Sequence, residues 1–326
     1  MTALVTGGCG FVGRHLVAAL KQRNIPVRVF DLHPLDGVES VVGSVEDRAA
    51  MTNAMRGAEI VYHLAGNAQL WTRDPKGFDR VNRQGTVNAL GAATVAGVRR
   101  FIHCSSLTTL VGRRTPIGTS TVGESVVQNP SDMLGPYPRS KLLAEQAVTA
   151  AVSAGLDAVI AVPTEPLGPG DDSLTPPTKM IVNLVNGRIP ATIDCTLNFV
   201  SVKSLAEGFI ACAARGRRGE RYILGGDNVP MAQLLDSLQG QTGKSMPRLS
   251  LPYAVALVAG VIDTAIISSV TGKPPKAPLT GVRLAGRRVV FSSAKAALEL
   301  GWKSESFDTA LAASLAWMRD RKLIAA

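Results

Sequence analysis

The stretch TALVTGGCGFVGRHLVAALKQRNIPVRVFD, residues 2–31, holds a glycine-rich turn between an apolar strand and an amphipathic helix. The run ALV predicts a buried strand, apolar residues recur at helical spacing from about Val12, and VRVFD predicts a second strand. Gly7, Gly10 and Gly13 lie at the strand-to-helix turn. Glycine permits a tight turn there, and the N–H groups that begin the helix can bind a pyrophosphate. The stretch therefore predicts a dinucleotide-binding βαβ unit.

The identity of the dinucleotide is indicated by Asp31, the last residue of the second predicted strand. An acid in this position accepts hydrogen bonds from the ribose hydroxyls and repels a 2′-phosphate. No arginine follows directly in LHP, residues 32–34. We therefore expect NAD, with NADP as the alternative, and an aspartate with a purely structural role remains the competing interpretation.

Strands and helices alternate through the first half of the chain. Three further strands and two helices are expected in the segments AEIVYHLAG (58–66), GTVNALGAATVAGV (85–98), RRFIHCSS (99–106), SKLLAEQAVTAAVSAG (140–155) and LDAVIAVP (156–163). Repeated βα units predict an α/β fold, a Rossmann-type doubly wound parallel sheet covered by helices on both faces. Ligands of such sheets bind beyond the carboxyl ends of the strands, which gathers Gly7, Asp31, Gly66, Ser105, Ser106 and Pro163 at one edge.

Composition limits the classes of function. With 326 residues, 46% hydrophobic and 18% charged, the chain is expected to be a packed globular protein. The net charge of +10 is dispersed in short basic clusters without interleaved aromatic residues, which argues against a nucleic-acid groove. A solvated basic surface is the simplest interpretation, and peripheral contact with anionic lipid is the secondary one.

Compartment and metal content follow from cysteines, histidines and the N-terminus. The four cysteines and four histidines show no metal-ligand spacing, so we expect no metal. The sequence begins almost at once with a predicted strand and shows no signal-peptide pattern, so a reducing, cytoplasmic location is expected.

One long apolar stretch, LPYAVALVAGVIDTAIISSVTG, covers residues 251–272. It approaches membrane-spanning length, but Asp263 and several hydroxyl residues would be costly at the centre of a bilayer. We expect no transmembrane span. A helix over residues 253–270 is expected instead, either as a lid over a lipophilic substrate or as core of a smaller domain.

The segment PYPRSKLLAEQAV, residues 136–148, places Tyr137 four residues before Lys141 at the start of a predicted helix. Residues four apart lie on the same helical face. Such a pair taken alone is usually a contact on a solvated helix, so its meaning depends on the rest of the chain.

Six motifs occur in the order typical of one family: TGGCGFVG (6–13), VYHLAG (61–66), VNRQGT (81–86), FIHCSS (101–106), YPRSK (137–141) and PLGPGD (166–171). Together they resemble the extended short-chain dehydrogenases/reductases over nearly the whole chain. The resemblance implies that Tyr137 is the acid/base at the substrate oxygen and that Lys141 stabilises its phenolate and binds the nicotinamide ribose. Ser106 would hold the substrate oxygen, with Ser105 as the alternative.

The same resemblance implies a set of cofactor contacts along the predicted sheet edge. They are Gly7, Gly10, Phe11, Val12, Gly13, Asp31, Ser44, Val45, Leu64, Ala65, Gly66, Asn82, Tyr137, Lys141, Pro163 and Thr164. One departure concerns the adenine: the segment VGSVED has Ser44 where relatives often carry aspartate, and Asp47 follows three residues later.

The second half of the chain bears on the substrate. Leu107 and two threonines follow Ser106, where dehydratase relatives place an acidic pair. Leu197 stands where many nucleotide-sugar enzymes have an arginine for the diphosphate, although Arg188 or Arg283 could substitute. Residues 187–302 contain segments similar to the hopanoid-associated sugar epimerase branch, near dihydroflavonol reductase-like and 3β-hydroxysteroid dehydrogenase-like members.

We therefore expect an NAD(P)-dependent oxidoreductase that interconverts a secondary alcohol and a ketone on a lipophilic small molecule. A nucleotide-sugar 4-epimerase with permanently bound NAD and a non-catalytic NAD-binding regulator are the alternatives. The expected domains are 1–162 plus 197–224 for the cofactor and 163–196 plus 225–326, a smaller C-terminal α/β domain, for the substrate. The segments LNFVSV (197–202) and RYIL (221–224) are expected to return to the main sheet. The resemblance also implies a homodimer formed through helices 85–96 and 140–154.

Overall fold

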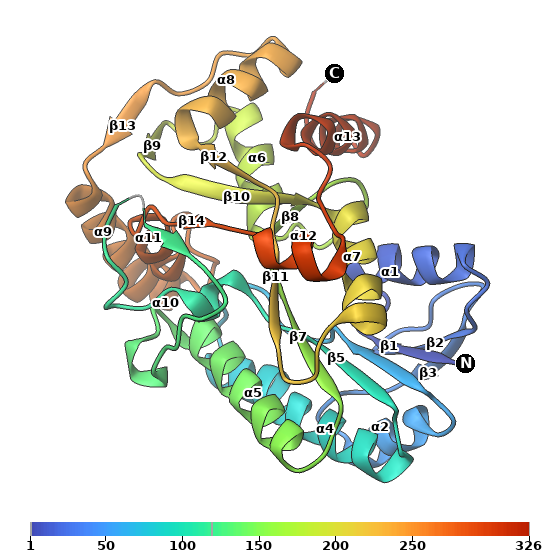
Figure 1. The fold of residues 1–326 in the computed structure, drawn as a ribbon. Helices are drawn as coiled ribbons and strands as arrows, with labels where there is room; N and C mark the ends of the chain where they lie inside the picture. The colour runs from blue at the N-terminus through green and yellow to red at the C-terminus, as the bar shows by residue number, and fades with distance from the viewer. Residues whose placement is uncertain (1, 119, 326) are drawn as a thin grey trace.

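A seven-stranded parallel sheet lies at the centre of the larger part of the molecule (Figure 1). The computed structural model describes residues 2–118 and 120–325. In spatial order the strands are β3 (Glu39–Val42), β2 (Val27–Asp31), β1 (Ala3–Thr6), β4 (Ile60–His63), β5 (Arg100–Cys104), β7 (Ala158–Pro163) and β11 (Arg221–Leu224). Neighbouring strands are parallel throughout. The predicted fold class is confirmed.

Helices cover both faces of this sheet, because strand residues alternate between two apolar layers. Leu4 and Phe101 pack on one side, while Val5 and Ile102 pack on the other. The first layer lies under α2 (Arg48–Met55), α4 (Gly85–Ala96) and α5 (Pro136–Ser153). The second lies under α1 (Phe11–Gln22), α7 (Val202–Arg215) and α12 (Ala294–Leu300).

Local sequence accounts for most of these elements. Helix α1 begins one residue before the predicted start. Helix α5 begins at Pro136, so Tyr137 lies at its start as expected, with proline in the first turn where no N–H is needed. Strand β3 was not predicted from the sequence. It is short and lies at the edge of the sheet, and its residues are exposed or half-buried, so it carries no apolar run.

A smaller part of the chain is built around a three-stranded sheet, seen in the upper half of Figure 1. Strand β10 (Thr196–Ser201) lies between β8 (Glu165–Leu167), to which it is parallel, and β12 (Asp227–Pro230), to which it is antiparallel. An apolar cluster joins this sheet to α6 (Pro176–Val185), α8 (Met231–Thr242) and α13 (Phe307–Asp320). Two further two-stranded pairs are β9 (Ala191–Ile193) with β13 (Leu249–Leu251) and β6 (Thr121–Val122) with β14 (Val290–Phe291).

The expected return of LNFVSV to the main sheet is wrong, whereas that of RYIL is confirmed. The chain leaves the main sheet at the end of β7 and begins β8 only two residues later. Strand β10 therefore pairs with β8 and does not join the main sheet. Helix α7 then leads back to β11, which pairs with β7. We propose a two-part division as expected from the sequence, with β10 moved to the smaller part.

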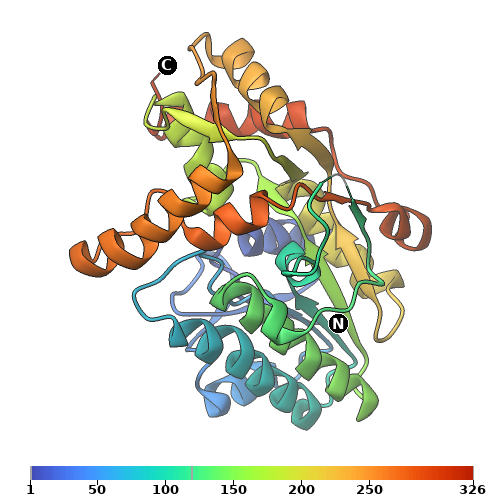
Figure 2. The same cartoon turned by 90° about the vertical axis from the view of Figure 1, so that its left-hand side faces the viewer.

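The apolar segment after residue 252 forms α9 (Tyr253–Ile262), η4 (Asp263–Ile267) and α10 (Ser268–Thr271), followed by α11 (Leu279–Ala285). Figure 2 shows this rod projecting from the side of the molecule. The expectation that it is core is wrong, since only Ala256 and Gly260 of α9 are buried. Within the described residues, no helix is both long enough and apolar enough to cross a bilayer.

Candidate active site

The turn between β1 and α1 is so tightly packed that only glycine fits at two positions. Gly7 has a φ of +74°, and a Cβ there would lie 2.6 Å from the backbone nitrogen of Ala65. A Cβ on Gly13 would lie 2.0 Å from the carbonyl oxygen of Gly7. Gly10, the N-cap of α1, supplies no side-chain cap, so the first N–H groups of the helix, on Phe11, Val12 and Gly13, remain for a ligand.

Asp31 lies beside this turn at the carboxyl end of β2. Its Oδ2 accepts a hydrogen bond from the N–H of Cys9 at 2.8 Å, and its Oδ1 accepts one from the N–H of Leu32 at 2.7 Å. Each carboxylate oxygen can accept another bond. The carboxylate is therefore held in place by backbone groups and can still accept two ribose hydroxyls.

Ser44 and Val45 follow β3 at the same edge. The Ser44 hydroxyl accepts a hydrogen bond from the N–H of Glu46 at 3.2 Å, and Val45 is buried against Gly85. Asp47 caps α2 by accepting hydrogen bonds from two N–H groups of its first turn. Its carboxylate thus has a structural role.

Asn82 lies in η1 (Asp79–Gln84), a stretch of π-helix that follows α3 (Lys76–Phe78) and leads into α4. The side chain is almost fully buried. Its Oδ1 accepts from the N–H of Asn67, and its Nδ2 donates to the Asn67 carbonyl oxygen and to Ser140 Oγ at 2.9 Å. Asn82 therefore ties the segment after Leu64, Ala65 and Gly66 to helix α5.

Tyr137 lies buried in the first turn of α5, 7% exposed. Burial raises the pKa of Tyr137 to about 12, while a hydrogen bond with the side chain of Ser106 acts in the opposite direction. The structure thus brings together Tyr137 and Ser106, which are 31 positions apart in the sequence. At neutral pH the side chain of Tyr137 is a phenol and can donate a proton.

The two serines after β5 have different partners. Ser105 Oγ donates to the Glu145 carboxylate, which also accepts from Thr109 Oγ1 at 2.7 Å and lies 3.5 Å from Arg221. Ser106 Oγ instead accepts from the N–H of Thr108 at 3.3 Å. Ser105 therefore anchors the segment, which leaves Ser106 beside Tyr137.

Glu145 was not singled out from the sequence, although a signal existed. Tyr137, Lys141 and Glu145 follow one another at intervals of four residues, so they share the buried face of α5. A carboxylate on a buried helical face requires partners. The structure supplies Ser105, Thr109 and Arg221 for it.

Lys141 is buried, and its Nζ donates to the carbonyl oxygen of Cys104 at 2.5 Å, at the carboxyl end of β5. A Cβ on Gly66 would lie 3.9 Å from the same Nζ, so the ammonium is placed between the ends of β4 and β5. The sequence suggested that Lys141 would lower the pKa of Tyr137. In the structure burial is the main influence and raises the pKa of Tyr137, whereas Lys141 does not contribute to the shift of this pKa.

Pro163 and Thr164 follow at the end of β7. Thr164 is 5% exposed, and its Oγ1 is buried with no hydrogen-bond partner among the described residues. A buried hydroxyl without a partner is costly unless a ligand completes it. Thr164 is therefore the residue at this edge that most directly indicates a bound polar group.

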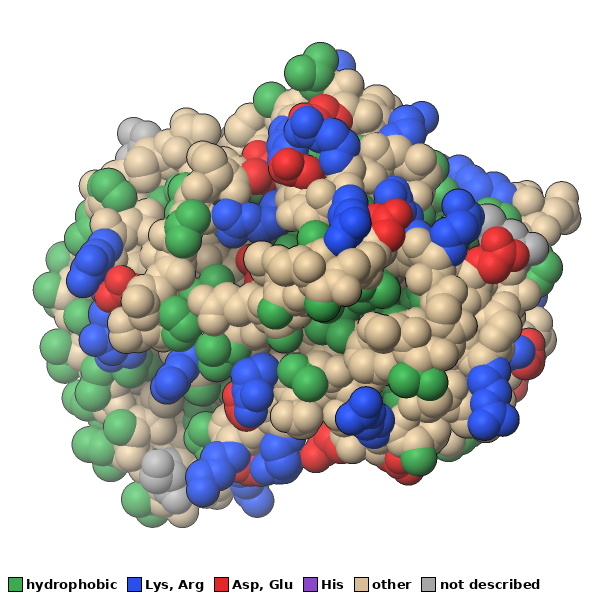
Figure 3. Space-filling model, turned by 60° about the horizontal axis from the view of Figure 1, so that its bottom comes forward, with side chains coloured by type: hydrophobic (Ala, Val, Ile, Leu, Met, Phe, Trp, Pro, Cys, Tyr) green, Lys and Arg blue, Asp and Glu red, His purple; other side chains and the backbone are tan. Residues whose placement is uncertain are grey.

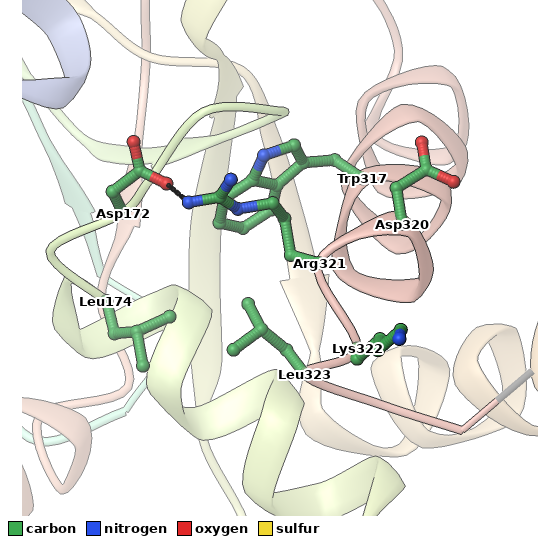
Figure 4. A pocket seen from close by; sticks show the side chains of 7 residues that line it. All are labelled: Asp172, Leu174, Trp317, Asp320, Arg321, Lys322 and Leu323. Carbon is green, nitrogen blue, oxygen red and sulfur yellow. Dashed lines mark hydrogen bonds and ion pairs between the residues drawn. The ribbon is translucent and has the colours of Figure 1, made fainter.

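A separate cavity of about 360 Å³ lies between α13 and the loop after β8 (Figure 4). Its lining residues include Asp172, Trp317 and Arg321, and none of the residues described above. Asp172 accepts hydrogen bonds from Arg321 and from Arg14 of α1. The Asp172 carboxylate is thus already paired. Within the described residues, no cluster of His, Cys, Asp or Glu could hold a metal ion.

Comparison with known proteins agrees with this arrangement. Residues 3–225 match the NAD dependent epimerase/dehydratase family. The chain belongs to this family. It is 30% identical to a putative dihydroflavonol 4-reductase of Synechocystis sp., over 97% of this chain and 94% of that protein. It is 31% identical to sterol demethylase protein B of Methylococcus capsulatus, over 99% of this chain and all of that protein.

A solved structure supports the same conclusion. The crystal structure of gox2253 superposes with a TM-score of 0.85 at 30% identity and covers 99% of both chains. The resemblance to extended short-chain dehydrogenases/reductases is thereby confirmed, and the protein is an enzyme of the NAD(P)-dependent oxidoreductase and epimerase class.

The residues of this chain fit NAD, the cofactor of the family. The backbone cradle at Gly7 and Gly13 leaves no space for side chains, Asp31 is held ready for ribose hydroxyls, and Thr164 has an unpaired buried hydroxyl. These features lie at the ends of β1, β2 and β7, along the edge where such sheets bind nucleotides.

Proposed function

We propose that the protein is an NAD-dependent oxidoreductase that interconverts a secondary alcohol and a ketone on a lipophilic substrate. The observation that carries this proposal is a buried phenol, Tyr137, beside Ser106, whose side chain lowers the pKa that burial raises, at the nucleotide edge of the sheet. NAD, when bound, supplies the site that accepts or returns the hydride.

In this proposal Tyr137 is the proton donor in the reduction of the ketone. A phenol with a pKa of about 12 stays protonated at neutral pH and can transfer its proton to the substrate oxygen as negative charge develops there. Ser106 would donate a hydrogen bond to the same oxygen and hold it within reach of Tyr137. Lys141, fixed by the Cys104 carbonyl, would bind ribose hydroxyls of the cofactor.

We assign the remaining contacts with NAD to the residues expected from the sequence. The pyrophosphate would be bound by the N–H groups after Gly10, the adenosine ribose by Asp31, the adenine side by Ser44 and Val45, and the nicotinamide side by Gly66, Pro163 and Thr164. The hydroxyl of Thr164, which is buried and unpaired among the described residues, supports the last assignment.

The lipophilic nature of the substrate is supported by two observations. One relative aligned over its full length is a sterol demethylase protein. Leu197, at the position where an arginine would hold a diphosphate, packs against the apolar cluster of the smaller part of the chain. A leucine provides no charge for a nucleotide sugar.

Replacing Tyr137 by Phe tests the chemistry. The variant is expected to bind NADH as the wild type does and to lose at least about 100-fold in kcat, the range for removal of a general acid. Ketone reduction is followed at 340 nm, and NADH affinity by calorimetry. A Tyr137→Phe enzyme with full activity would contradict the assignment.

A nucleotide-sugar 4-epimerase is the second candidate, because the family includes such enzymes and the same tyrosine could serve. An epimerase returns the hydride to the same substrate and therefore keeps its NAD. Purified protein that carries one NAD per chain and turns over without added cofactor would establish this candidate and defeat the first. Net oxidation of NADH by a ketone would do the reverse.

We also propose a cytoplasmic homodimer. All four cysteines are free thiols, which suits a reducing compartment. Val87 and Val95 are exposed on α4, which lies beside α5 on one face of the sheet (Figure 1). Light scattering of wild type and of Val95→Glu, the more exposed of the two, measures the association: the variant is expected to be monomeric.

A further inference from the structure

The helical rod formed by α9, η4 and α10 exposes its apolar side chains to solvent. We call its exposed aliphatic residues the apolar ridge. They are between 40% and 83% exposed and comprise Val255, Val258, Val261, Ile262, Ile266, Ile267 and Val270. Scattered exposed aliphatic residues are normal, but seven on one short rod form a patch that marks an interaction site.

Three polar residues of the rod, Asp263, Thr264 and Ser268, face the protein instead. Asp263 Oδ2 accepts from the N–H of Ala277 at 2.8 Å, and Thr264 Oγ1 accepts from the N–H of Leu279 at 3.0 Å. Ser268 is 2% exposed. A surface helix of a globular protein normally has the reverse orientation, with its apolar stripe toward the core. The rod is thus held to the protein by polar contacts while its apolar face is left outward.

Cations gather at the end of the apolar ridge. Lys273 and Lys276 follow α10 directly and are exposed. Arg73, also exposed, reaches across from another segment and donates from Nε to the Gly272 carbonyl oxygen at 2.6 Å. Figure 3 shows the corresponding margin of the molecule, on its left side, with hydrophobic side chains at the rim and Lys and Arg next to them.

We propose that the apolar ridge docks on the surface of an anionic lipid bilayer. An aliphatic face flanked by basic residues is the composition of helices that lie in the membrane interface, with the apolar side buried about 5–10 Å. A second copy of the chain suits the ridge less well. Protein interfaces are enriched in aromatic residues and depleted of lysine, whereas the ridge is aliphatic and has lysines at its end.

The apolar ridge is connected to the candidate active site, so docking would serve access to a lipophilic substrate. This part of the inference rests on the proposed function. Helix α11 packs against the inner side of α9, where a Cβ on Gly260 would lie 3.3 Å from Val282. Thr280, at the start of α11, lies close to Gly135: a Cβ on Gly135 would be 2.3 Å from Thr280 Oγ1. Gly135 directly precedes the helix that carries Tyr137. The ridge is therefore connected through α9 and α11 to the start of α5, so docking would bring the helix that carries Tyr137 close to a bilayer that holds a lipophilic substrate.

Vesicle co-sedimentation of the full chain tests the docking. The wild type is expected to bind phosphatidylcholine vesicles that contain phosphatidylglycerol, and to bind less as salt is raised. The double variant Ile262→Glu/Ile266→Glu is expected to lose binding. Leu298→Glu is the matched control, since this leucine is 87% exposed on α12, and it should bind as the wild type does. Lys273→Gln/Lys276→Gln should weaken binding about 30-fold, the effect of two cations near an anionic surface.

Two results would overturn the proposal. One is equal vesicle binding by the wild type and Ile262→Glu/Ile266→Glu. The other is a wild type that does not bind vesicles but forms a dimer, in sedimentation velocity, that this double variant dissociates. Melting curves verify that the variants fold. Turnover of a water-soluble ketone by the double variant, together with vesicle binding by Tyr137→Phe, separates a failure of docking from a failure of the proposed chemistry.

Discussion

Replacing Gly13 by Ala tests whether the turn after β1 is the cofactor cradle. The added Cβ would lie 2.0 Å from the Gly7 carbonyl oxygen and 2.8 Å from the Gly8 Cα. Both neighbours are backbone atoms, so no side chain can rotate away, and the start of α1 must move outward. We expect this shift to displace the N–H groups that we assign to the pyrophosphate.

The size of the effect follows from these contacts. Overpacking of this kind lowers the free energy of unfolding by about 1–3 kcal/mol. With an unfolding entropy of about 2.1 cal/mol/K per residue over 326 residues, the melting temperature should fall by about 2–4 °C. Loss of two hydrogen bonds to a charged group, at about 1.5–3 kcal/mol each, should weaken NAD binding at least about 100-fold.

Gly240→Ala is the control for Gly13→Ala. Gly240 lies in α8, and a Cβ there would have no neighbour within 4 Å. This change should leave NAD affinity unaltered and stabilise the protein by about 0.5–1 kcal/mol. Calorimetric titration with NAD and thermal unfolding measure both variants. A folded Gly13→Ala protein with NAD affinity within about threefold of wild type would refute the placement of the pyrophosphate at this turn.

Three further outcomes are expected. The pKa of Tyr137 is raised to about 12, so below that pH the fraction of phenolate, which alcohol oxidation needs, increases about tenfold per pH unit. The rate of alcohol oxidation should therefore rise steeply with pH, while the rate of ketone reduction stays level from about pH 6 to 9. Parallel pH–rate profiles of the two directions would contradict this. Glu145→Ala removes the carboxylate that accepts from the buried hydroxyls of Ser105 and Thr109, and should cost about 1–3 kcal/mol of folding free energy in urea unfolding. An unchanged midpoint would show that these bonds contribute nothing. Asp31→Ala should raise the ratio of NADP to NAD affinity, measured by titration with each, and an unchanged ratio would remove Asp31 from ribose recognition.

Much of the fold was readable from local sequence, because each signal depends on neighbours in the chain. The glycine spacing before α1, the apolar runs of β1, β2, β4, β5 and β7, and the helical periodicity of α4 and α5 are all of this kind. The motif order was sufficient to identify the family. The placement of β10 was not readable, because a strand's partner is chosen among all strands within reach, and β8 is too short to be predicted.

The candidate site divides in the same way. Residue types and spacing identified Tyr137, Lys141 and the serine pair as candidates. Which serine lies beside Tyr137 depends on Glu145, because its carboxylate accepts a hydrogen bond from Ser105. The pKa of Tyr137 depends on burial, which outweighs charge effects once the phenol is enclosed.

By itself, then, the sequence determined the βα alternation, the glycine turn and the candidate reactive side chains, because these depend on residues close together in the chain. Only the tertiary structure decided which groups face one another and which face solvent. The rod at residues 253–271 illustrates the difference. Its composition suggested a lid over the substrate or a core helix, but the 277–279 backbone binds Asp263 and Thr264 while the aliphatic face is exposed. Orientation of this kind depends on contacts that hydrophobicity does not encode.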